Sequence, residues 1–419
     1  MLQLLLGGSG SGKTTLLYQR IRTRAEKGEK SILLVPEQFT SSTEGRIYRE
    51  LGDALSGMVE SFSFTSLAEK ILSTEGGAAV QTLSDAGRAV LVRRALEELQ
   101  DNVHYYHRHR RSAAFCQMAA QTIDELKSAG LSGRQLAQLA GACGAESGKL
   151  SELALIFQGY ETLLARSGMD PSDRLELAGA RLEEALARHS LPEFLRDRAV
   201  FIDEFDTFNA PKKRLLGAML AALPSVTVAL CDDGAPLLPG DLSLFSGAKQ
   251  VAAQLRQLAR KNGAEVAVPQ LLRKDLRHRN APGLAAVAEL LETGSCTADA
   301  PAGEVRLFAA SSREEEARAA AGAIRRLMRQ GVRCGKIAVV CRDIAKYRAA
   351  VRYEFRMAEI PLYCDEPTTP EFSAPATAVR ALLEIARGAD LTENLTTLAK
   401  TGLCALSEEQ VCALENYAY

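Results

Sequence analysis

A glycine-rich loop near the start of the chain carries residue types that bind phosphate. Residues 7–14 read Gly-Gly-Ser-Gly-Ser-Gly-Lys-Thr and directly follow the apolar run 2–6. Glycines let successive backbone N–H groups point at one anion, at the positive end of the helix predicted after the loop. In such a loop the lysine neutralises the β- and γ-phosphates, and the threonine hydroxyl holds Mg²⁺. A chance match in a glycine-rich turn is the alternative. The pattern predicts a nucleoside triphosphate site formed by Gly7, Gly8, Ser9, Gly10, Ser11, Gly12, Lys13, Thr14 and Thr15.

A pair of carboxylates is the expected partner of this loop. Residues 200–204 read Val-Phe-Ile-Asp-Glu, an apolar strand that ends in two acidic residues. At the carboxyl edge of the same sheet, Asp203 would hold Mg²⁺ together with Thr14, and Glu204 would polarise the water that attacks the γ-phosphate. Acidic residues commonly follow strands, so this interpretation depends on the glycine-rich loop.

The elements that must position these residues alternate along the first part of the chain. Short apolar runs predict strands, amphipathic periodicity predicts the helices between them, and together they predict an α/β fold with a parallel, doubly wound sheet. From residue 65 to 196 only helical patterns occur, which predicts a large all-helical insertion. Residues 271–302 are predicted to be a linker. The predicted strands are 2–6, 31–35, 59–62, 199–202 and 226–230, and the predicted helices include 14–24, 86–99, 113–128 and 150–166.

A second α/β unit is predicted from residue 305. Strands at 305–308 and 337–341 alternate with helices at 313–329 and 344–357. Arg342 follows the second of these strands, where its guanidinium could reach a γ-phosphate across a cleft between the two units. A strand-end arginine paired with a surface carboxylate is an equal alternative. The helical pattern then runs to Tyr419 without a closing glycine or proline, so the sequence is expected to be a fragment of a longer protein.

Composition limits the class of protein. The 419 residues are 47% hydrophobic with a formal charge of −1, so any nucleic acid must bind in local grooves, not in a global positive field. Nine scattered cysteines without a Cys-x-x-Cys pair argue against zinc and against a disulfide framework, and favour a reducing cytoplasm. The apolar N-terminal run is too short for a signal peptide or a membrane span, so no membrane partner is expected.

Several short motifs, in their order and spacing, carry a family resemblance over the whole chain. Besides the glycine-rich loop they are Leu-Val-Pro-Glu-Gln-Phe-Thr at 34–40, Glu-Ser-Phe-Ser-Phe-Thr-Ser-Leu-Ala at 60–68, Asp-Glu-Leu-Lys at 124–127 and Lys-Leu-Ser-Glu-Leu at 149–153. Together they resemble the B subunit of the bacterial AddAB helicase–nuclease. The resemblance implies a P-loop NTPase fold like that of superfamily 1 helicases. It would place a P-loop domain (1A) in residues 1–70 and 197–290, the helical insertion (1B) in 71–196, and the start of a second domain (2A) in 300–419.

The resemblance also implies a function. Such a subunit belongs to an ATP-dependent helicase/deoxyribonuclease, binds ATP, Mg²⁺ and single- and double-stranded DNA, and forms a heterodimer with an A subunit. It processes double-strand breaks for recombinational repair and helps to recognise a hotspot sequence. The family's nuclease domain and the ligands of its [4Fe–4S] cluster would lie outside this chain. A non-hydrolysing DNA-reading scaffold is one alternative. A P-loop phosphotransferase for small molecules is another, against which the helical insertion and the second unit count.

Two segments are candidates for DNA contact. The first follows the strand at 59–62, where hydroxyls could bind phosphates and an aromatic ring could stack on a base; it comprises Ser61, Phe62, Ser63 and Thr65. A helix N-cap with core phenylalanines is the alternative there. The second is the run 104–111, which mixes cations with aromatic residues and includes Arg108, Arg110 and Arg111. An ordinary solvated connection is its alternative, and a third basic run at 273–279 is expected to be simply solvated.

Overall fold

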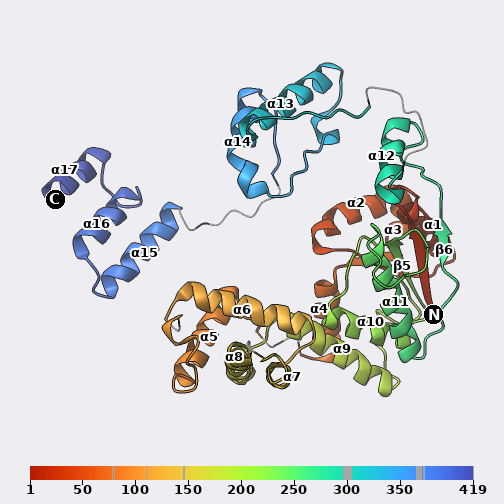
Figure 1. Cartoon of the computed structure of the whole chain (residues 1–419), viewed down its shortest axis with the longest axis horizontal. Coiled ribbons are helices and arrows are strands. Elements are labelled where there is room, and N and C mark those ends of the chain that lie inside the picture. The colour runs from red at the N-terminus through yellow and green to blue at the C-terminus, as the bar shows by residue number, and fades with distance from the viewer. Residues whose placement is uncertain are drawn as a thin grey trace. The chain divides into compact units, whose positions relative to one another are not determined.

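Six parallel strands form the central sheet, in the order β3-β2-β4-β5-β1-β6. The computed structural model describes residues 1–418 except 78, 80, 110, 145–146, 296–303, 365–369 and 371–372. The chain divides into two units, Met1–Val305 and Arg306–Tyr419, and the sheet belongs to the first (Figure 1). The strands are β1 (Leu2–Gly7), β2 (Ser31–Leu34), β3 (Val59–Phe62), β4 (Ala199–Ile202), β5 (Ser225–Cys231) and β6 (Gln270–Leu272). The five predicted strands and their parallel pairing are confirmed, whereas β6 lies in the segment that was predicted to be a linker.

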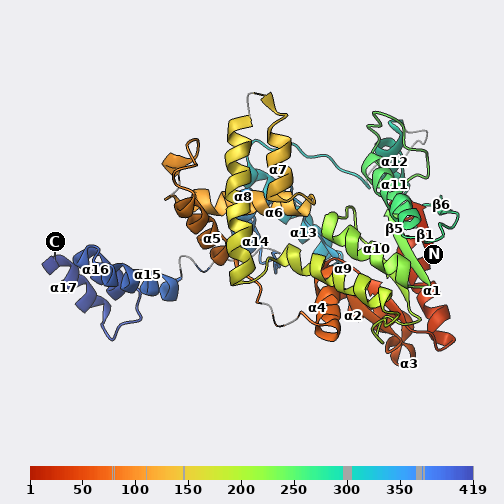
Figure 2. The ribbon, with the colours of Figure 1, turned by 90° about the horizontal axis from the view of Figure 1, so that it is seen from below.

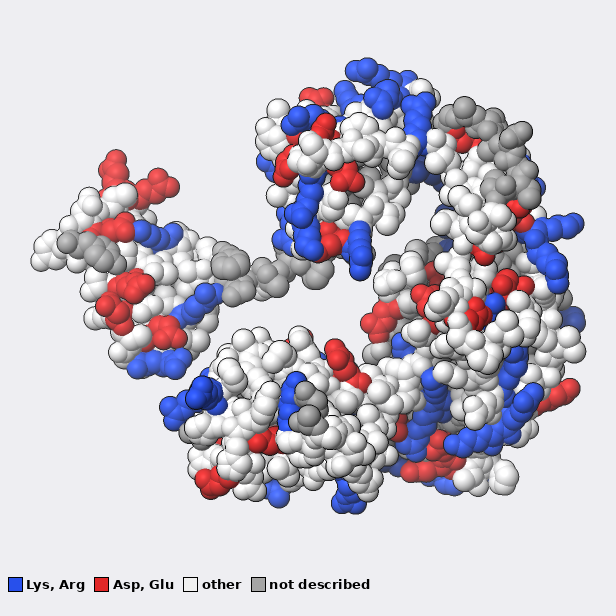
Figure 3. Space-filling model, viewed as in Figure 1, with Lys and Arg blue, Asp and Glu red and all other residues white. Residues whose placement is uncertain are grey.

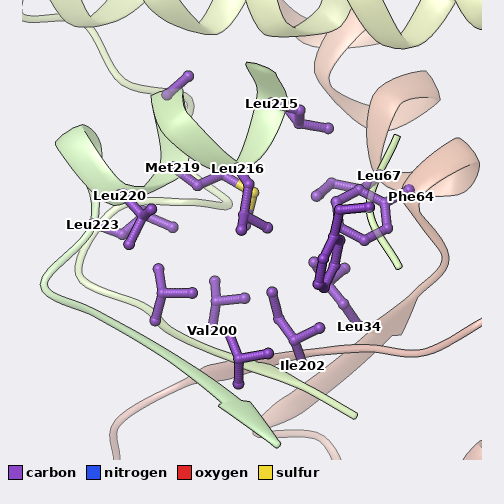
Figure 4. Close-up of a cluster of buried hydrophobic side chains, with 14 of the residues drawn as sticks. Leu34, Phe64, Leu67, Val200, Ile202, Leu215, Leu216, Met219, Leu220 and Leu223 are labelled. Carbon is purple, nitrogen blue, oxygen red and sulfur yellow. The ribbon is translucent and has the colours of Figure 1, made fainter. Parts of the chain in front are cut away.

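Helices cover both faces of this sheet, which explains why its inner strands β2 and β4 are mostly apolar and fully buried. On one face, Val200 and Ile202 of β4 point toward Leu216 of α10 (Ala210–Ala222), and Phe64 of α4 (Phe64–Glu75) closes the same core (Figure 4). Residues of α9 (Pro171–Ala187) and α11 (Ser246–Lys261) extend this layer. The alternate strand residues, such as Phe201, face α1 (Lys13–Glu26), α2 (Thr40–Leu51) and α3 (Asp53–Ser56). The sheet is therefore doubly wound.

The helical insertion has a hydrophobic core of its own. It is built from α5 (Asp85–Glu98), α6 (Ala113–Ser128), α7 (Gly133–Ala140) and α8 (Ser147–Ser167), and no strand element occurs among its described residues. Figure 2 shows these helices grouped together, with α9 running alongside α10. A buried polar cluster joins α6 and α8 to the start of α9. Lys127 Nζ lies 2.7 Å from Asp170 Oδ2 and 2.7 Å from Asp173 Oδ2, and the Tyr160 hydroxyl donates to Asp170 Oδ1 at 2.6 Å.

The second unit contains helices but no strand among its described residues. They are α13 (Arg313–Arg329), α14 (Ile344–Met357), α15 (Ala374–Ala386), α16 (Leu391–Lys400) and α17 (Glu408–Ala418), so the helices predicted at 313–329 and 344–357 are confirmed. The strands predicted at 305–308 and 337–341 are wrong for this structure: Leu307 and Val340 are 101% and 92% exposed. An apolar run becomes a strand only when a neighbouring strand takes its backbone hydrogen bonds, and no described segment pairs with either run.

Candidate nucleotide-binding site

The glycine-rich loop joins β1 to α1 at the carboxyl edge of the sheet, the edge at which open α/β sheets bind ligands. A Cβ at Gly7 would lie 2.6 Å from the carbonyl oxygen of Leu272, so the close approach of β6 requires glycine there. Gly10 and Gly12 have φ values of 80° and 91°, in the left-handed region that favours glycine. Gly12 precedes α1 without offering a capping side chain, and the first turn of α1 contains no acidic residue. The positive end of the helix is therefore available to an anion.

Lys13 lies folded over its own loop. Its Nζ donates hydrogen bonds to the carbonyl oxygens of Gly7 and Gly8, both at 2.8 Å. Burial lowers the pKa of the Lys13 ammonium below its ordinary value, while the charges of Cys231 and Asp203 oppose this shift. A partly desolvated ammonium is stabilised by a bound anion, which is the role that the sequence predicts for this residue.

Thr14 and Asp203 face each other from α1 and the end of β4. Burial raises the pKa of the Asp203 carboxyl, although hydrogen bonds from the Thr14 hydroxyl and the Glu204 N–H act in the opposite direction. Asp203 is only 6% exposed. A hydroxyl and a buried carboxylate side by side provide oxygen ligands of the kind that Mg²⁺ prefers, and a cation here would relieve the desolvation of the carboxylate. These two residues therefore fit a magnesium ion bound together with a nucleotide.

Glu204 has an unusual backbone conformation. Its φ is 64°, a left-handed value that costs a non-glycine residue free energy, and its N–H donates to Asp203 Oδ1 at 3.0 Å. Burial and the neighbouring charge of Asp203 raise the pKa of the Glu204 carboxyl. Strain of this kind is found most often at functional sites, and here it turns the exposed Glu204 side chain toward the same hollow as Asp203.

Arg277, in the basic run that the sequence predicts to be solvated, also contacts the glycine-rich loop. The short strand β6 lies next to β1, so the residues after it lie on the glycine-rich loop. The Leu276 N–H donates to the carbonyl oxygen of Gly10 at 3.0 Å, and Arg277 Nη1 donates to Ser9 Oγ at 3.2 Å. Arg277 is exposed, as expected for the run at 273–279, and it also makes this hydrogen bond to the glycine-rich loop. The signal that could have identified it is the short segment Gln-Leu-Leu at 270–272, read as a sixth strand.

These residues surround one hollow of about 540 Å³. Its lining combines the loop and the first turn of α1 with the acidic pair, Arg277 and Cys231. Arg46 of α2 also borders it. The lining of the hollow thus combines the cations Lys13, Arg46 and Arg277 with the carboxylates Asp203 and Glu204, a composition suited to a phosphate chain with a divalent metal ion.

The predicted DNA contacts at 61–65 have partners within the fold. The Ser63 side chain caps α4 by accepting from the Ser66 N–H at 3.1 Å, and Ser66 Oγ accepts in return from the Ser63 N–H at 2.8 Å. Phe62 packs against the core. Ser61 is half-buried and Thr65 is exposed. The alternative of a helix N-cap is therefore present at Ser63.

The run at 104–111 is held against the helical insertion by its backbone. Both carboxylate oxygens of Glu152 accept N–H groups from residues 104–106, at 2.7–3.2 Å. Arg108 and Arg111 are exposed, and Arg110 lies outside the described residues. Positive and negative side chains are interspersed in the view of Figure 3, in keeping with the formal charge of −1. Neither DNA segment is tested by these contacts, and both stay predictions.

Arg342 belongs to the second unit. It is exposed, precedes α14, and has no carboxylate within 4.0 Å among the described residues. Its predicted reach toward a γ-phosphate stays a prediction. No group of three or more His, Cys, Asp or Glu residues in the described ranges is arranged to hold a metal ion, so the implied iron–sulfur cluster has no support here. Among the same residues, no helix is long and apolar enough to cross a bilayer.

The fold and this hollow define an α/β protein whose parallel sheet is flanked by helices and carries a glycine-rich loop at its carboxyl edge. A sequence model described as "ADDB, N-terminal" matches residues 4–288, more than half of the chain, and the chain belongs to this family. Curated proteins named as the B subunit of an ATP-dependent helicase/deoxyribonuclease are similar over 99% of the chain. Examples come from Desulforudis audaxviator (33% identical, covering 36% of that protein), Symbiobacterium thermophilum (32%, 37%) and Moorella thermoacetica (31%, 37%). The chain thus spans little more than a third of the length of these relatives.

Proposed function

We propose that this chain is the nucleotide-binding N-terminal part of a helicase–nuclease B subunit, which binds Mg·ATP at the glycine-rich loop and acts on DNA together with an A subunit. Processing of double-strand breaks, hotspot recognition and a cytoplasmic location are parts of the same proposal. The names of the similar proteins support the class of activity. The hollow in which loop amides, Lys13, Thr14 and Asp203 converge is the observation that carries the proposal for this chain.

The roles within the hollow follow from charge and position. The loop amides and Lys13 would bind the phosphates, and Arg277 would add a second cation beside Ser9. Thr14 and Asp203 would hold Mg²⁺, which supplies charge neutralisation at the β- and γ-phosphates. Glu204 would accept a proton from the attacking water, and its raised pKa places it nearer to neutral pH than an ordinary carboxylate. The predicted role of Arg342 at a γ-phosphate is kept as part of the same proposal.

The domain layout is proposed in the same terms. Residues 1–70 and 197–290 would form the nucleotide-binding domain, 71–196 the inserted domain, and 300–419 the beginning of a second helicase-like domain. Two segments of the first unit would contact DNA, one through Ser61, Phe62, Ser63 and Thr65, and the other through Arg108, Arg110 and Arg111.

Substitution of Lys13 tests the nucleotide site. Lys13→Ala removes the buried ammonium and should weaken Mg·ATP binding by at least about tenfold, or ~1.4 kcal/mol. Titration with a fluorescent ATP analogue measures this, and Lys27→Ala, an exposed lysine at the end of α1, is the matched control. Equal affinity in folded wild type and Lys13→Ala would refute the proposed site.

A further inference from the structure

Arg46 lines two neighbouring hollows. It is half-buried on α2 and borders both the hollow of the glycine-rich loop and a smaller one of about 260 Å³. Thr14, Asp203 and Glu204 border both hollows as well, whereas the loop glycines and Lys13 border only the larger. Arg46 therefore lines the hollow of the glycine-rich loop together with the acidic pair, and it also lines the adjoining hollow that lacks the loop glycines.

The side chain of Arg46 is supported in this place. Its guanidinium carbon lies 4.8 Å from the centroid of the Tyr18 ring, and Tyr18 is only 5% exposed. A guanidinium held by its face on an aromatic ring keeps its N–H groups free around its edge. No carboxylate in the described part of the chain lies within 4.0 Å of it. The charge of Arg46 nevertheless reaches the site, since it lowers the pKa of both Asp203 and Glu204.

A planar fork of donors beside a metal-binding carboxylate is the chemistry that recognises a terminal phosphate. Arg49 offers a comparison from the same helix. It is exposed and borders only the smaller hollow, so it has the same charge without the approach to the glycine-rich loop.

We propose that Arg46 binds the terminal phosphate of the nucleotide and makes the site favour a nucleoside triphosphate over a diphosphate. This inference rests on the proposed nucleotide site and adds a specificity-determining residue to it. A merely structural Arg46, held on Tyr18 to stabilise α2, would affect both nucleotides equally.

The test compares Mg·ATP and Mg·ADP affinities in wild type, Arg46→Ala, Arg46→Gln and Arg49→Ala. Arg46→Gln keeps the length of the side chain, in case Arg46→Ala does not fold. Either Arg46 variant should lose at least tenfold in ATP affinity, with ADP affinity within twofold of wild type. Arg49→Ala should change neither. A further variant, Arg46→Lys, keeps the charge but lacks the planar group of donors. It should retain only part of the wild-type preference for ATP over ADP.

The outcomes separate this inference from the site on which it rests. If ATP binds wild type in a Lys13-dependent manner but both Arg46 variants keep the wild-type ratio of ATP to ADP affinity, the inference is wrong and the site stands. An equal loss for both nucleotides would assign Arg46 a structural or general electrostatic role and would also overturn it. If wild type binds neither nucleotide, the proposed site and the inference fall together.

Discussion

The guanidinium of Arg277 donates a hydrogen bond of 3.2 Å to the hydroxyl of Ser9, although the two residues are 268 positions apart in the sequence. The contact exists because β6 pairs with β1 in parallel register, with Leu272 beside Gly7. Two loops at the carboxyl ends of neighbouring strands therefore share one surface. This geometry brings the cation of Arg277 beside the glycine-rich loop.

Removal of the Arg277 side chain should weaken nucleotide binding. Arg277→Ala takes a cation out of the hollow and should reduce Mg·ATP affinity about tenfold, or ~1.4 kcal/mol, because charge-assisted hydrogen bonds to phosphate are strong. Arg273→Ala removes the same charge from an exposed residue in the same run and should leave the affinity within twofold. Equilibrium titration of both variants measures the difference. If both substitutions changed the Mg·ATP affinity by the same small factor, Arg277 would have no specific role in nucleotide binding.

Substitution of Glu204 should lower ATP turnover without weakening Mg·ATP binding. Glu204→Gln keeps the size of the side chain but cannot accept a proton, so Mg·ATP affinity should stay near that of wild type while turnover at this site drops about a hundredfold. Turnover is measured in the assembled complex after the nucleotide site of the partner motor has been inactivated. An unchanged residual rate would mean that this site binds ATP without hydrolysing it, as the scaffold alternative requires.

Arg108 and Arg111 follow the segment whose backbone N–H groups bind Glu152, and they should contribute to the salt dependence of DNA binding. Each phosphate contact on a single strand contributes about 0.7 to the slope of log K against log salt, so Arg108→Ala with Arg111→Ala should flatten the slope by about 1.4. Arg93→Ala with Arg94→Ala is the control, because these exposed residues of α5 are already paired with Glu97 and Glu98. Identical slopes in both double variants would assign the run at 104–111 to an ordinary connection.

The buried cluster at the start of α9 should be sensitive to loss of its cation. Lys127 is 10% exposed and Asp170 is 1% exposed, so Lys127→Met leaves a buried carboxylate without its countercharge. The free energy of unfolding should fall by about 3–5 kcal/mol. Tyr160→Phe removes one neutral donor from the same carboxylate and should cost only ~1 kcal/mol. Denaturant unfolding measures the free energy of unfolding of both variants. A similarly small decrease in both would show that the Lys127–Asp170 ion pair contributes little to stability.

The sequence alone predicted the parts of the site whose chemistry is local. The glycine-rich loop, the acidic pair after β4, five of the six strands and the helical insertion all follow from residue type and short-range periodicity. A strand buried on both faces is mostly apolar, and an amphipathic helix has apolar residues every three to four positions. Each pattern can therefore be recognised within its own segment of the sequence. The predicted strands at 305–308 and 337–341 failed for the same reason, because an apolar run does not reveal whether another strand lies beside it.

Only the tertiary structure decided which distant residues share the hollow. Strand order placed β6 next to β1 and so brought Arg277 to Ser9, and the packing of α2 against α1 set Arg46 over Tyr18. Neither relationship has a period or a motif within one segment, since each depends on a contact between two different elements. The proposed phosphate site was therefore predictable from the sequence of its glycine-rich loop, whereas the positions of Arg46 and Arg277 beside it depend on contacts between elements of the fold.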